Sequence, residues 1–588
     1  MSQRKNRGAC QTHESNEATH PAMNATDTPP AERPPRAAAT LVVVRDAASG
    51  GIEVLLSRRA ERGDHNSGAW VFPGGMVDPG DRAAHACCVG LDDATASAQL
   101  GVKEGGLDFH IAAVRECFEE SGLLFASDAD GQLITLDAVG DTAFGPSIAE
   151  WRGPLHRGER SLVELCAETG LRLAVDRLAY LSHWLTPPGR AKRFDTRFFI
   201  AAAPPAQIGA HDGTEQLEQL WLRPADALAR SAALKLMTPT QATLEIIARH
   251  DNVDSLLAWA RAPREVPLVM PRVGTGRAGV RPVLPSEHAW AEIGRLDPAG
   301  HGHACYDIQP GVAVRLSSRL IRVTANNGSV MTGPGTNTYL VGGGDENEWA
   351  VIDPGPLDAA HIEAILAAAP GPIRWIFATH THTDHSPAVA PLAARTGARV
   401  FGRLTAHPEW QDKSFAPDQH LEGGEAFSLP GHTTLRVIHT PGHASNHLCY
   451  LLEEEKLLFT GDHVMQASTV VINPPDGDMS AYVASLRSLL ALELDWLAPG
   501  HGFLMAEPRR AMEAIIAHRL RREAKVVAVM KALGPATIEQ LLPQVYDDVH
   551  ERLWPVAKRS LLAHLLKLRD DQIAADADER WLLIGGVV

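Results

Sequence analysis

The chain has 588 residues, so we expect two or three domains. Its formal net charge of −16 at pH 7 argues against nonspecific binding of nucleic acid over the whole surface, but it is compatible with local basic patches. Its seven cysteines show no CxxC spacing, which argues against a secreted disulfide framework and against a structural cysteine–zinc site. No stretch approaches the ~20 uninterrupted apolar residues of a membrane span, and the amino terminus lacks the apolar core of a signal peptide, so we expect a cytoplasmic protein without a membrane partner.

The amino-terminal segment and the first domain differ sharply in composition. Residues 1–36 are polar and rich in proline, and we expect them to be disordered because they cannot bury enough apolar surface to offset the entropy of ordering. The following runs, TLVVVRD and IEVLLSRR, predict a pair of buried strands, and RFDTRFFIAA predicts a later strand of the same domain. We therefore place a first domain at residues 37–250.

The segment AAVRECFEESGLL predicts a helix with three carboxylates on one face. Glu116, Glu119 and Glu120 are spaced i, i+3 and i+4, whereas the apolar residues of the segment fall on the opposite face. Like charges held together cost free energy that a bound cation would offset, which favours a metal site. The alternative is an acidic stripe that is simply solvated.

A glycine-rich segment, WVFPGGMVDPGD, lies upstream of this helix, and the two segments together resemble the box of the Nudix hydrolases. Gly75 matches the start of that box, and its end is matched by Arg115, Glu116, Glu119, Glu120, Gly122 and Leu123. An insertion separates the two halves, and Asp81 stands where a glutamate is usual. The segments KRFDTRFFIA and LMTPTQATL resemble the branch that includes peroxisomal coenzyme A diphosphatases.

The Nudix resemblance implies an α/β/α sandwich that cleaves a pyrophosphate bond in a nucleoside-diphosphate-linked compound. Glu116, Glu119 and Glu120 would hold Mg²⁺ or Mn²⁺, and Glu119, Glu120 and Arg115 would be the catalytic side chains. Arg115 would orient a glutamate by a charge-assisted hydrogen bond. Glu215 is a candidate for a further ligand or base, against the alternative of an ordinary exposed acid.

Residues 251–310 hold many proline and glycine residues, as in VPLVMPRVGTGRAGVRPVLP, and predict a linker or loosely packed connector. Strand-like patterns resume at VAVRL and TNTYLVGG, so we place a second domain at residues 311–507.

Histidine and aspartate side chains, which commonly bind metal ions, follow strand-like runs at four places in the second domain: IFATHTHTDHSPA, HTPGHA, FTGDH and APGHG. The candidate ligands are His380, His382, Asp384, His385, His443, Asp462 and His501. Any one of these histidines taken alone is better explained as solvated or singly hydrogen-bonded. Together they favour a metal centre, because ligands gather at strand ends and because these residues suffice for two zinc ions that share a carboxylate.

The HxHxDH motif, followed by separate His, Asp and His positions, resembles the metallo-β-lactamase superfamily. The resemblance implies an αββα sandwich with two Zn²⁺ ions at one edge of its sheets. Matched residue by residue, the first zinc site would comprise His380, His382 and His443, and the second Asp384, His385 and His501. Asp462 would bridge the ions, and Asp384 would also be catalytic by orienting the attacking hydroxide.

Shorter segments narrow the comparison within this superfamily. MTGPGTNTYLVG, VIDPG and HTPGHASNHLCYLL resemble a lactamase-like group that includes a mitochondrial single-strand endoribonuclease, with glyoxalase II-like thioesterases as close neighbours. A thioester, another ester and a phosphodiester therefore all stay open as substrates. We expect His447 to be an ordinary surface or core histidine, against the alternative that it supports a ligand or faces the substrate. We expect Asp353 to tighten a turn or support a ligand.

Residues 508–588 predict a small winged-helix-like domain, because amphipathic helices at TIEQLLPQVY and PVAKRSLLAHLLKLRD precede a short strand, RWLLIG. Its first helix is locally basic, and Arg519, Arg521 and Arg522 are candidates for guiding single-stranded RNA into the zinc cleft. The alternative is that the module packs on the second domain and shapes its entrance.

The sequence thus predicts a multidomain α/β and α+β hydrolase with a dinuclear zinc site and a Nudix domain. A small-molecule substrate is expected, possible candidates being a nucleotide or a coenzyme A derivative. An acyl-coenzyme A has a thioester for the zinc site and a pyrophosphate for the Nudix site. The alternative is an endoribonuclease-like zinc hydrolase that acts on RNA, with the Nudix domain as a non-catalytic nucleotide sensor.

Overall fold

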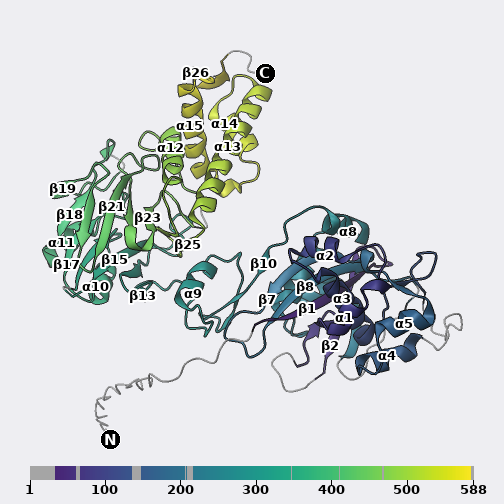
Figure 1. Ribbon diagram of the computed structural model, residues 1–588. Coiled ribbons are helices and arrows are strands. Elements are labelled where there is room, and N and C mark those ends of the chain that lie inside the picture. The colour runs from purple at the N-terminus through teal and green to yellow at the C-terminus, as the bar shows by residue number, and fades with distance from the viewer. Residues whose placement is uncertain are drawn as a thin grey trace, which may run out of the picture.

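The computed structural model shows mixed α/β units that follow one another along the chain, with α9 lying between the first unit and the later ones (Figure 1). The residues that the structure describes are 34–60, 67–135, 148–205, 207, 216–345, 347–408, 411–466 and 469–584. Glu215 and residues 1–33 of the expected disordered tail lie outside these ranges. Among the described helices, none is both long enough and apolar enough to cross a membrane.

The first unit is built on an eight-stranded mixed sheet whose central path runs β10–β7–β8–β1–β2–β3. Its strands are β1 (Arg36–Asp46), β2 (Ile52–Arg59), β3 (Trp70–Val71), β4 (Gly74–Met76), β7 (Ala179–Leu185), β8 (Phe194–Ala202), β9 (Gln216–Leu222) and β10 (Leu268–Val269). A separate pair is formed by β5 (Ala126–Ser127) and β6 (Arg172–Leu173). Pairing of β4 with β1, from Ala38 opposite Met76 to Thr40 opposite Gly74, fixes the glycine-rich segment against the sheet.

Helices cover both faces of this sheet. Because strand side chains alternate between faces, Leu41 and Val43 join one core and Val42 and Val44 the other. The first core is covered by α2 (Asp93–Leu100), α3 (Gly106–Ser121), α4 (Ile148–His156) and α5 (Leu162–Thr169), and α1 (Pro79–Ala83) contacts α3 and α5. The second is covered by α6 (Pro224–Ala229), α7 (Thr238–Ile247) and α8 (Val253–Arg261). The insertion that divides the glycine-rich segment from the carboxylate helix therefore contributes α2 to one face, whereas α1 begins within the glycine-rich segment itself.

The predicted connector is folded rather than loose. Its β11 (Arg272–Gly274) and β12 (Arg281–Val283) pair with each other, and α9 (Trp290–Leu296) packs in a small core with Phe503. One end of the segment adds β10 to the first sheet, and α9 is joined to the next unit by a buried ion pair between Glu292 and Arg322. Proline and glycine content indicated irregular backbone but not these tertiary contacts.

The second unit consists of two sheets packed face to face, with helices on both outer faces. The first sheet contains β13 (Ala313–Arg315), β14 (Leu320–Thr324), β15 (Asn337–Gly343), β16 (Glu348–Ile352), β17 (Ile373–Phe377), β18 (Arg399–Gly402) and β19 (Gln419–His420). The second contains β20 (Ala426–Leu429), β21 (Thr433–His439), β22 (Leu448–Leu452), β23 (Leu457–Gly461), β24 (Trp496–Pro499) and β25 (Met505–Ala506). Side chains of both sheets share one core, and α10 (Ala359–Ala368) and α11 (Val389–Thr396) cover one outer face while α12 (Met479–Leu489) covers the other. The predicted αββα sandwich is confirmed.

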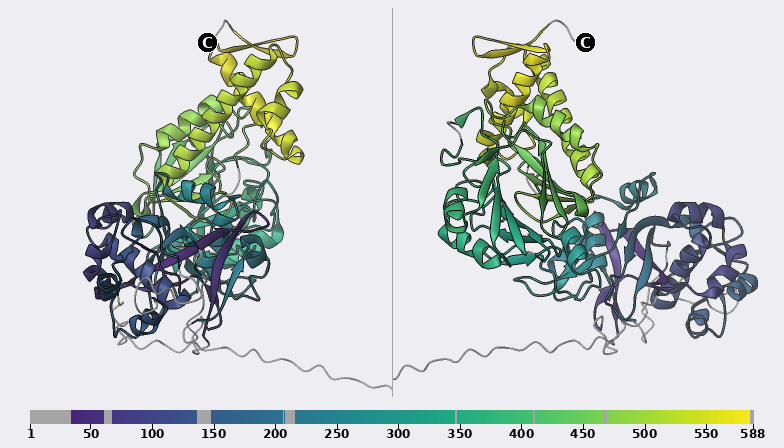
Figure 2. Two further views of the ribbon diagram at one scale, coloured as in Figure 1. Left: turned by 90° about the vertical axis from the view of Figure 1, so that its right-hand side faces the viewer. Right: turned by 60° about the vertical axis from the view of Figure 1, so that its left-hand side comes forward.

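The carboxy-terminal unit has its own core, formed by α13 (Pro508–Leu533), α14 (Ile538–Val545), α15 (Trp554–Asp570) and the hairpin of β26 (Ala574–Ala577) and β27 (Arg580–Leu583). Figure 2 shows α13 running along the second unit before it reaches the carboxy-terminal helices. The module packs on the sandwich, since α13 and α15 contribute to the core over α12.

The prediction that three arginines of α13 face RNA is wrong for two of them. Arg519 is 3% exposed and donates to the carbonyl of Val470, and Arg522 is 8% exposed and donates to Asp548 at 2.8 Å. Their guanidinium groups hold the helix against the second unit and against α14, whereas Arg521 is exposed. Counting charges along the helix could not reveal these partners.

Candidate metal centre

Strand ends at one edge of the sandwich deliver the metal-type side chains. His380, His382, Asp384 and His385 follow β17, and the remaining candidates follow β21, β23 and β24. The structure gathers all seven candidates into two groups, His380–His382–His443 and Asp384–His385–Asp462–His501, in each of which the ligand atoms lie within 4.8 Å of one another.

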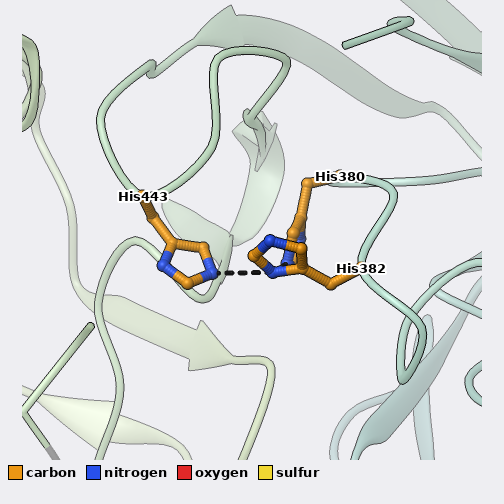
Figure 3. Close-up of side chains that lie close together, drawn as sticks. All are labelled: His380, His382 and His443. Carbon is orange, nitrogen blue, oxygen red and sulfur yellow. Dashed lines mark hydrogen bonds between the residues drawn. The ribbon is translucent and has the colours of Figure 1, made fainter. Parts of the chain in front are cut away.

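Three imidazole nitrogens of the first group point at one another (Figure 3). His382 Nδ1 lies 2.9 Å from His380 Nε2 and 3.0 Å from His443 Nε2. Ligand atoms around a tetrahedral zinc ion, at Zn–N distances of about 2.0–2.1 Å, stand about 3.3 Å apart. The spacing is therefore close to that of a zinc ion's ligands.

Asp462 faces both groups. Its Oδ1 lies 3.3 Å from His385 Nε2 and 3.2 Å from His501 Nε2, and its Oδ2 lies 3.7 Å from His443 Nε2. Asp384 Oδ2 completes the second group at 3.5 Å from the Nε2 atoms of His385 and His501. A carboxylate with one oxygen toward each group is placed to bridge two ions.

Hydrogen bonds behind the site fix the histidine rings. The Nδ1 atoms of His443 and His501 lie 2.8 Å from the carbonyl of Val471 and 3.1 Å from that of Gly335, so these nitrogens donate and leave Nε2 with a lone pair. His385 Nδ1 lies 2.9 Å from Asp353 Oδ2. Such outward bonds hold imidazoles in the tautomer that binds metal.

The second group contains buried polar atoms that no protein group satisfies. Within the part of the chain that the structure describes, the buried atoms His385 Nε2, His501 Nε2 and Asp462 Oδ1 have no hydrogen-bond partner. Native proteins rarely leave such atoms unpaired, and these three converge on one point. A cation at that point would satisfy all three, so the residues fit a metal ion.

Burial and neighbouring charges shift the pKa values of several candidate ligands. Burial, with His385 and His382 nearby, lowers the pKa of His380 well below its ordinary value, and burial with His443 lowers the pKa of His382 to about 4. Burial opposes ionisation of Asp462, but His501 and His385 outweigh it and hold the pKa of this carboxyl well below its usual range. His380 and His382 are therefore neutral and ready to bind a cation, while Asp462 supplies negative charge.

Asp353 and His447 lie behind the ligands. Asp353 accepts hydrogen bonds from the backbone N–H and hydroxyl of Thr379, both at 2.7 Å, and its contact with His385 Nδ1 makes it a support for a ligand. His447 is fully buried, with Nδ1 2.9 Å from Thr440 Oγ1, which matches the expected core histidine. The carbonyls of Val471 and Gly335 could not be found from the sequence, because any residue type supplies a carbonyl.

The carboxylate helix α3 carries a second, different site. Glu119 and Glu120 are 5% and 6% exposed, which excludes a solvated acidic stripe. Glu120 Oε2 accepts a hydrogen bond from the backbone N–H of Gly74 at 3.0 Å. A Cβ atom on Gly75 would come within 2.3 Å of Glu116 Oε1, so the close approach of the glycine-rich segment to the helix needs glycine at this position.

Arg115 links the acidic groups of this site. Its guanidinium donates to Asp81 at 2.8 Å and to Glu116 at 2.9 Å, and lies 3.5 Å from Glu119 Oε2. Asp81, which is 1% exposed, is thus engaged by Arg115. Although all are described, Glu116, Glu119 and Glu120 do not form a group whose oxygens all lie within 4.8 Å of one another, in contrast to the zinc candidates.

Burial gives Glu119 an unusual titration, which predicts a pH dependence of stability. Desolvation, opposed by Arg115, raises the pKa of Glu119 from 4.5 to about 7. Between these values the folded protein holds a proton that the unfolded chain has lost, so the free energy of unfolding falls as pH rises. In EDTA-treated protein we expect the wild type to lose about 2–3 kcal/mol relative to Glu119→Gln across this window. Denaturant titrations at several pH values measure the difference, and a difference that stays constant would contradict the assignment.

Family models match four parts of the chain. The NUDIX domain matches residues 34–89, the NUDT19 Nudix domain residues 89–243, the Metallo-beta-lactamase superfamily residues 331–501, and the Beta-lactamase associated winged helix domain residues 537–581. The matches confirm the expected order of Nudix, metallo-β-lactamase and winged-helix units.

Individual proteins resemble parts of the chain. The Beta-lactamase-like protein 2 homolog of Drosophila melanogaster is 32% identical over 283 residues, covering 45% of this chain and 94% of that protein. An Atrochrysone carboxyl ACP thioesterase of Aspergillus chevalieri is 30% identical, covering 47% and 90% respectively. The crystal structure of a NUDIX hydrolase from Alicyclobacillus acidocaldarius is 28% identical, with a TM-score of 0.32, covering 38% and 96%.

Proposed function

Because this chain belongs to the metallo-β-lactamase superfamily and also carries Nudix and winged-helix domains, we propose that it is a zinc hydrolase acting on thioesters, with a second, pyrophosphate-cleaving site in the Nudix domain. The observation that carries the proposal is the convergence of three buried atoms, His385 Nε2, His501 Nε2 and Asp462 Oδ1, that make no hydrogen bond to the described residues, beside a cluster of three further imidazole nitrogens.

Each of the two spatial groups of proposed ligands would bind one zinc ion. His380, His382 and His443 would hold one ion, Asp384, His385 and His501 the other, and Asp462 would bind both. Two imidazole-rich sites of this kind suit zinc better than magnesium or calcium, which prefer oxygen ligands. When bound, the zinc ions would supply Lewis acidity that activates water and polarises a carbonyl or phosphoryl oxygen.

Asp384 is the side chain best placed to act on the attacking water. Its side chain is 26% exposed, whereas that of Asp462 is 10% exposed and that of His385 is fully buried. One oxygen of Asp384 lies among the Nε2 atoms of the second group, and the exposure leaves this carboxylate in reach of solvent. We propose that Asp384 orients the water and accepts its proton, while Asp462 stays ionised between the two groups.

Two considerations support a thioester as substrate. The relative from Aspergillus chevalieri is named as a thioesterase that acts on a carrier-protein-linked group. The fusion itself also points to coenzyme A derivatives, because one acyl-coenzyme A contains both a thioester and a pyrophosphate. In the Nudix site, Glu116, Glu119 and Glu120 would hold Mg²⁺ or Mn²⁺, with Arg115 orienting Glu116 and Glu119.

Mass spectrometry of reaction products tests the proposal. Purified, metal-replete protein is incubated with a short-chain acyl-coenzyme A and, separately, with a single-stranded RNA oligonucleotide. We expect free coenzyme A from the wild type, a loss of at least about 10²-fold in Asp384→Ala, and retained thioester cleavage in Glu120→Gln. Acyl-phosphopantetheine formed by Asp384→Ala and absent from the double variant Asp384→Ala/Glu120→Gln would show the Nudix activity. RNA fragments without thioester cleavage would overturn the thioester assignment.

A further inference from the structure

A third group of metal-type side chains lies outside both proposed sites, in the segment between the Nudix unit and the sandwich. Asp297, His301 and His303, in the sequence DPAGHGH after α9, place ligand atoms within 4.8 Å of one another. His301 Nδ1 lies 3.6 Å from Asp297 Oδ1, and the rings of His301 and His303 stack with their centroids 5.5 Å apart.

Asp297 is a preformed anionic anchor. Its side chain is 4% exposed, and its oxygens accept backbone N–H bonds from His301 at 3.0 Å, Gly302 at 2.6 Å and His303 at 3.1 Å. Burial opposes ionisation, but these N–H donors hold the pKa of the Asp297 carboxyl below its ordinary value. A carboxylate has about four acceptor positions, so three N–H bonds leave capacity for a cation.

The loop that carries the histidines is fixed directly after His303, while the rings of His301 and His303 stay accessible. Thr275 donates its backbone N–H to the carbonyl of Ala304, and Tyr306 donates to the carbonyl of Thr275, both at 2.9 Å. The side chain of His301 is 62% exposed and can rotate toward Asp297 without disturbing a core. Only side-chain rotations are needed to bring these ligand atoms to metal-binding distance.

We propose that Asp297, His301 and His303 bind one further transition-metal ion of the zinc class, with water completing its coordination. Two imidazoles and one carboxylate are a donor set that favours zinc over magnesium or calcium. The loop also touches the Nudix unit: a Cβ atom on Gly189, in the turn between β7 and β8, would come within 2.7 Å of the carbonyl oxygen of Gly300. The ion would order the loop where the connector contacts the Nudix unit.

Metal counting on the full-length chain tests this site. The double variant His301→Ala/His303→Ala is compared with His288→Ala, which removes an exposed histidine of the same segment. Each protein is stripped with EDTA, reloaded with Zn²⁺, desalted and analysed by inductively coupled plasma mass spectrometry. We expect the double variant to hold one zinc equivalent fewer than the wild type and His288→Ala to hold the same number. Because the replaced side chains are exposed, the double variant is expected to fold.

Hydrogen–deuterium exchange supplies a second measurement that does not depend on total stoichiometry. Zinc is expected to slow exchange of the backbone amides of residues 297–304 in the wild type and in His382→Ala, which disturbs only the proposed catalytic centre. The double variant is expected to show no such slowing. Equal zinc content in wild type and double variant, or zinc-independent exchange of this loop, would overturn the third site while leaving the dinuclear centre untouched.

Discussion

Replacing Asp462 by alanine is expected to lower kcat/KM of the zinc-dependent hydrolysis by about 10³-fold or more, which corresponds to about 4 kcal/mol of transition-state stabilisation. The reason is geometric: the two oxygens of this carboxylate lie 3.2–3.7 Å from imidazole nitrogens of both ligand groups. Its loss removes a shared anion and leaves two sets of ligands without a bridge. Steady-state kinetics and zinc content measured on the same preparation check the prediction.

A matched control for this variant is Asp495→Ala. Asp495 is an exposed carboxylate just before β24, the strand that delivers His501 at its other end. We expect this variant to retain wild-type rate and zinc content. Full zinc content and near-normal rate in Asp462→Ala would contradict the bridging role.

Replacing Glu292 by alanine is expected to reduce the free energy of unfolding of the sandwich by about 3–5 kcal/mol, because it leaves a buried guanidinium without a counter-charge. The Glu292 carboxylate lies 2.6 and 2.9 Å from the two terminal nitrogens of Arg322, with side-chain exposures of 3% and 2%. Glu292 also accepts the backbone N–H of Leu504 at 2.8 Å, three residues after His501. The variant should therefore loosen the strand end that positions a metal ligand as well as the attachment of α9.

Chemical denaturation followed by intrinsic fluorescence and by zinc release separates these effects, since a multidomain chain unfolds in more than one transition. The double variant Glu292→Met/Arg322→Met is expected to recover much of the lost stability, because two apolar side chains leave no unpaired charge. A loss below about 1 kcal/mol in Glu292→Ala would show that the pair does not hold the connector to the sandwich.

The sandwich and its candidate ligands could be predicted from sequence because each ligand follows an apolar strand run. His443, Asp462 and His501 lie in different segments, yet each comes directly after a strand whose carboxyl end reaches the same edge. For these residues, the local strand pattern in the sequence also indicates where the side chain lies in the fold. The carbonyls that orient His443 and His501 could not be predicted in this way, because they belong to segments without any characteristic side chain.

Prediction failed where a tertiary partner outweighed local composition. Arg519 and Arg522 make α13 basic, but the Val470 carbonyl and Asp548 bury them in packing contacts. The connector is rich in proline and glycine, but Glu292 and Arg322 fix it to the sandwich. Asp81 departs from the usual box, and only the structure shows that its partner is Arg115.

The most direct test of the central claim is a crystal structure of the zinc-loaded protein with anomalous scattering recorded at the zinc absorption edge. We expect two zinc ions at the edge of the sandwich, one bound by His380, His382 and His443 and the other by Asp384, His385 and His501. Asp462 should contact both at about 2.0–2.2 Å. A single ion, or two ions that Asp462 does not bridge, would contradict the dinuclear centre on which the proposed activity rests.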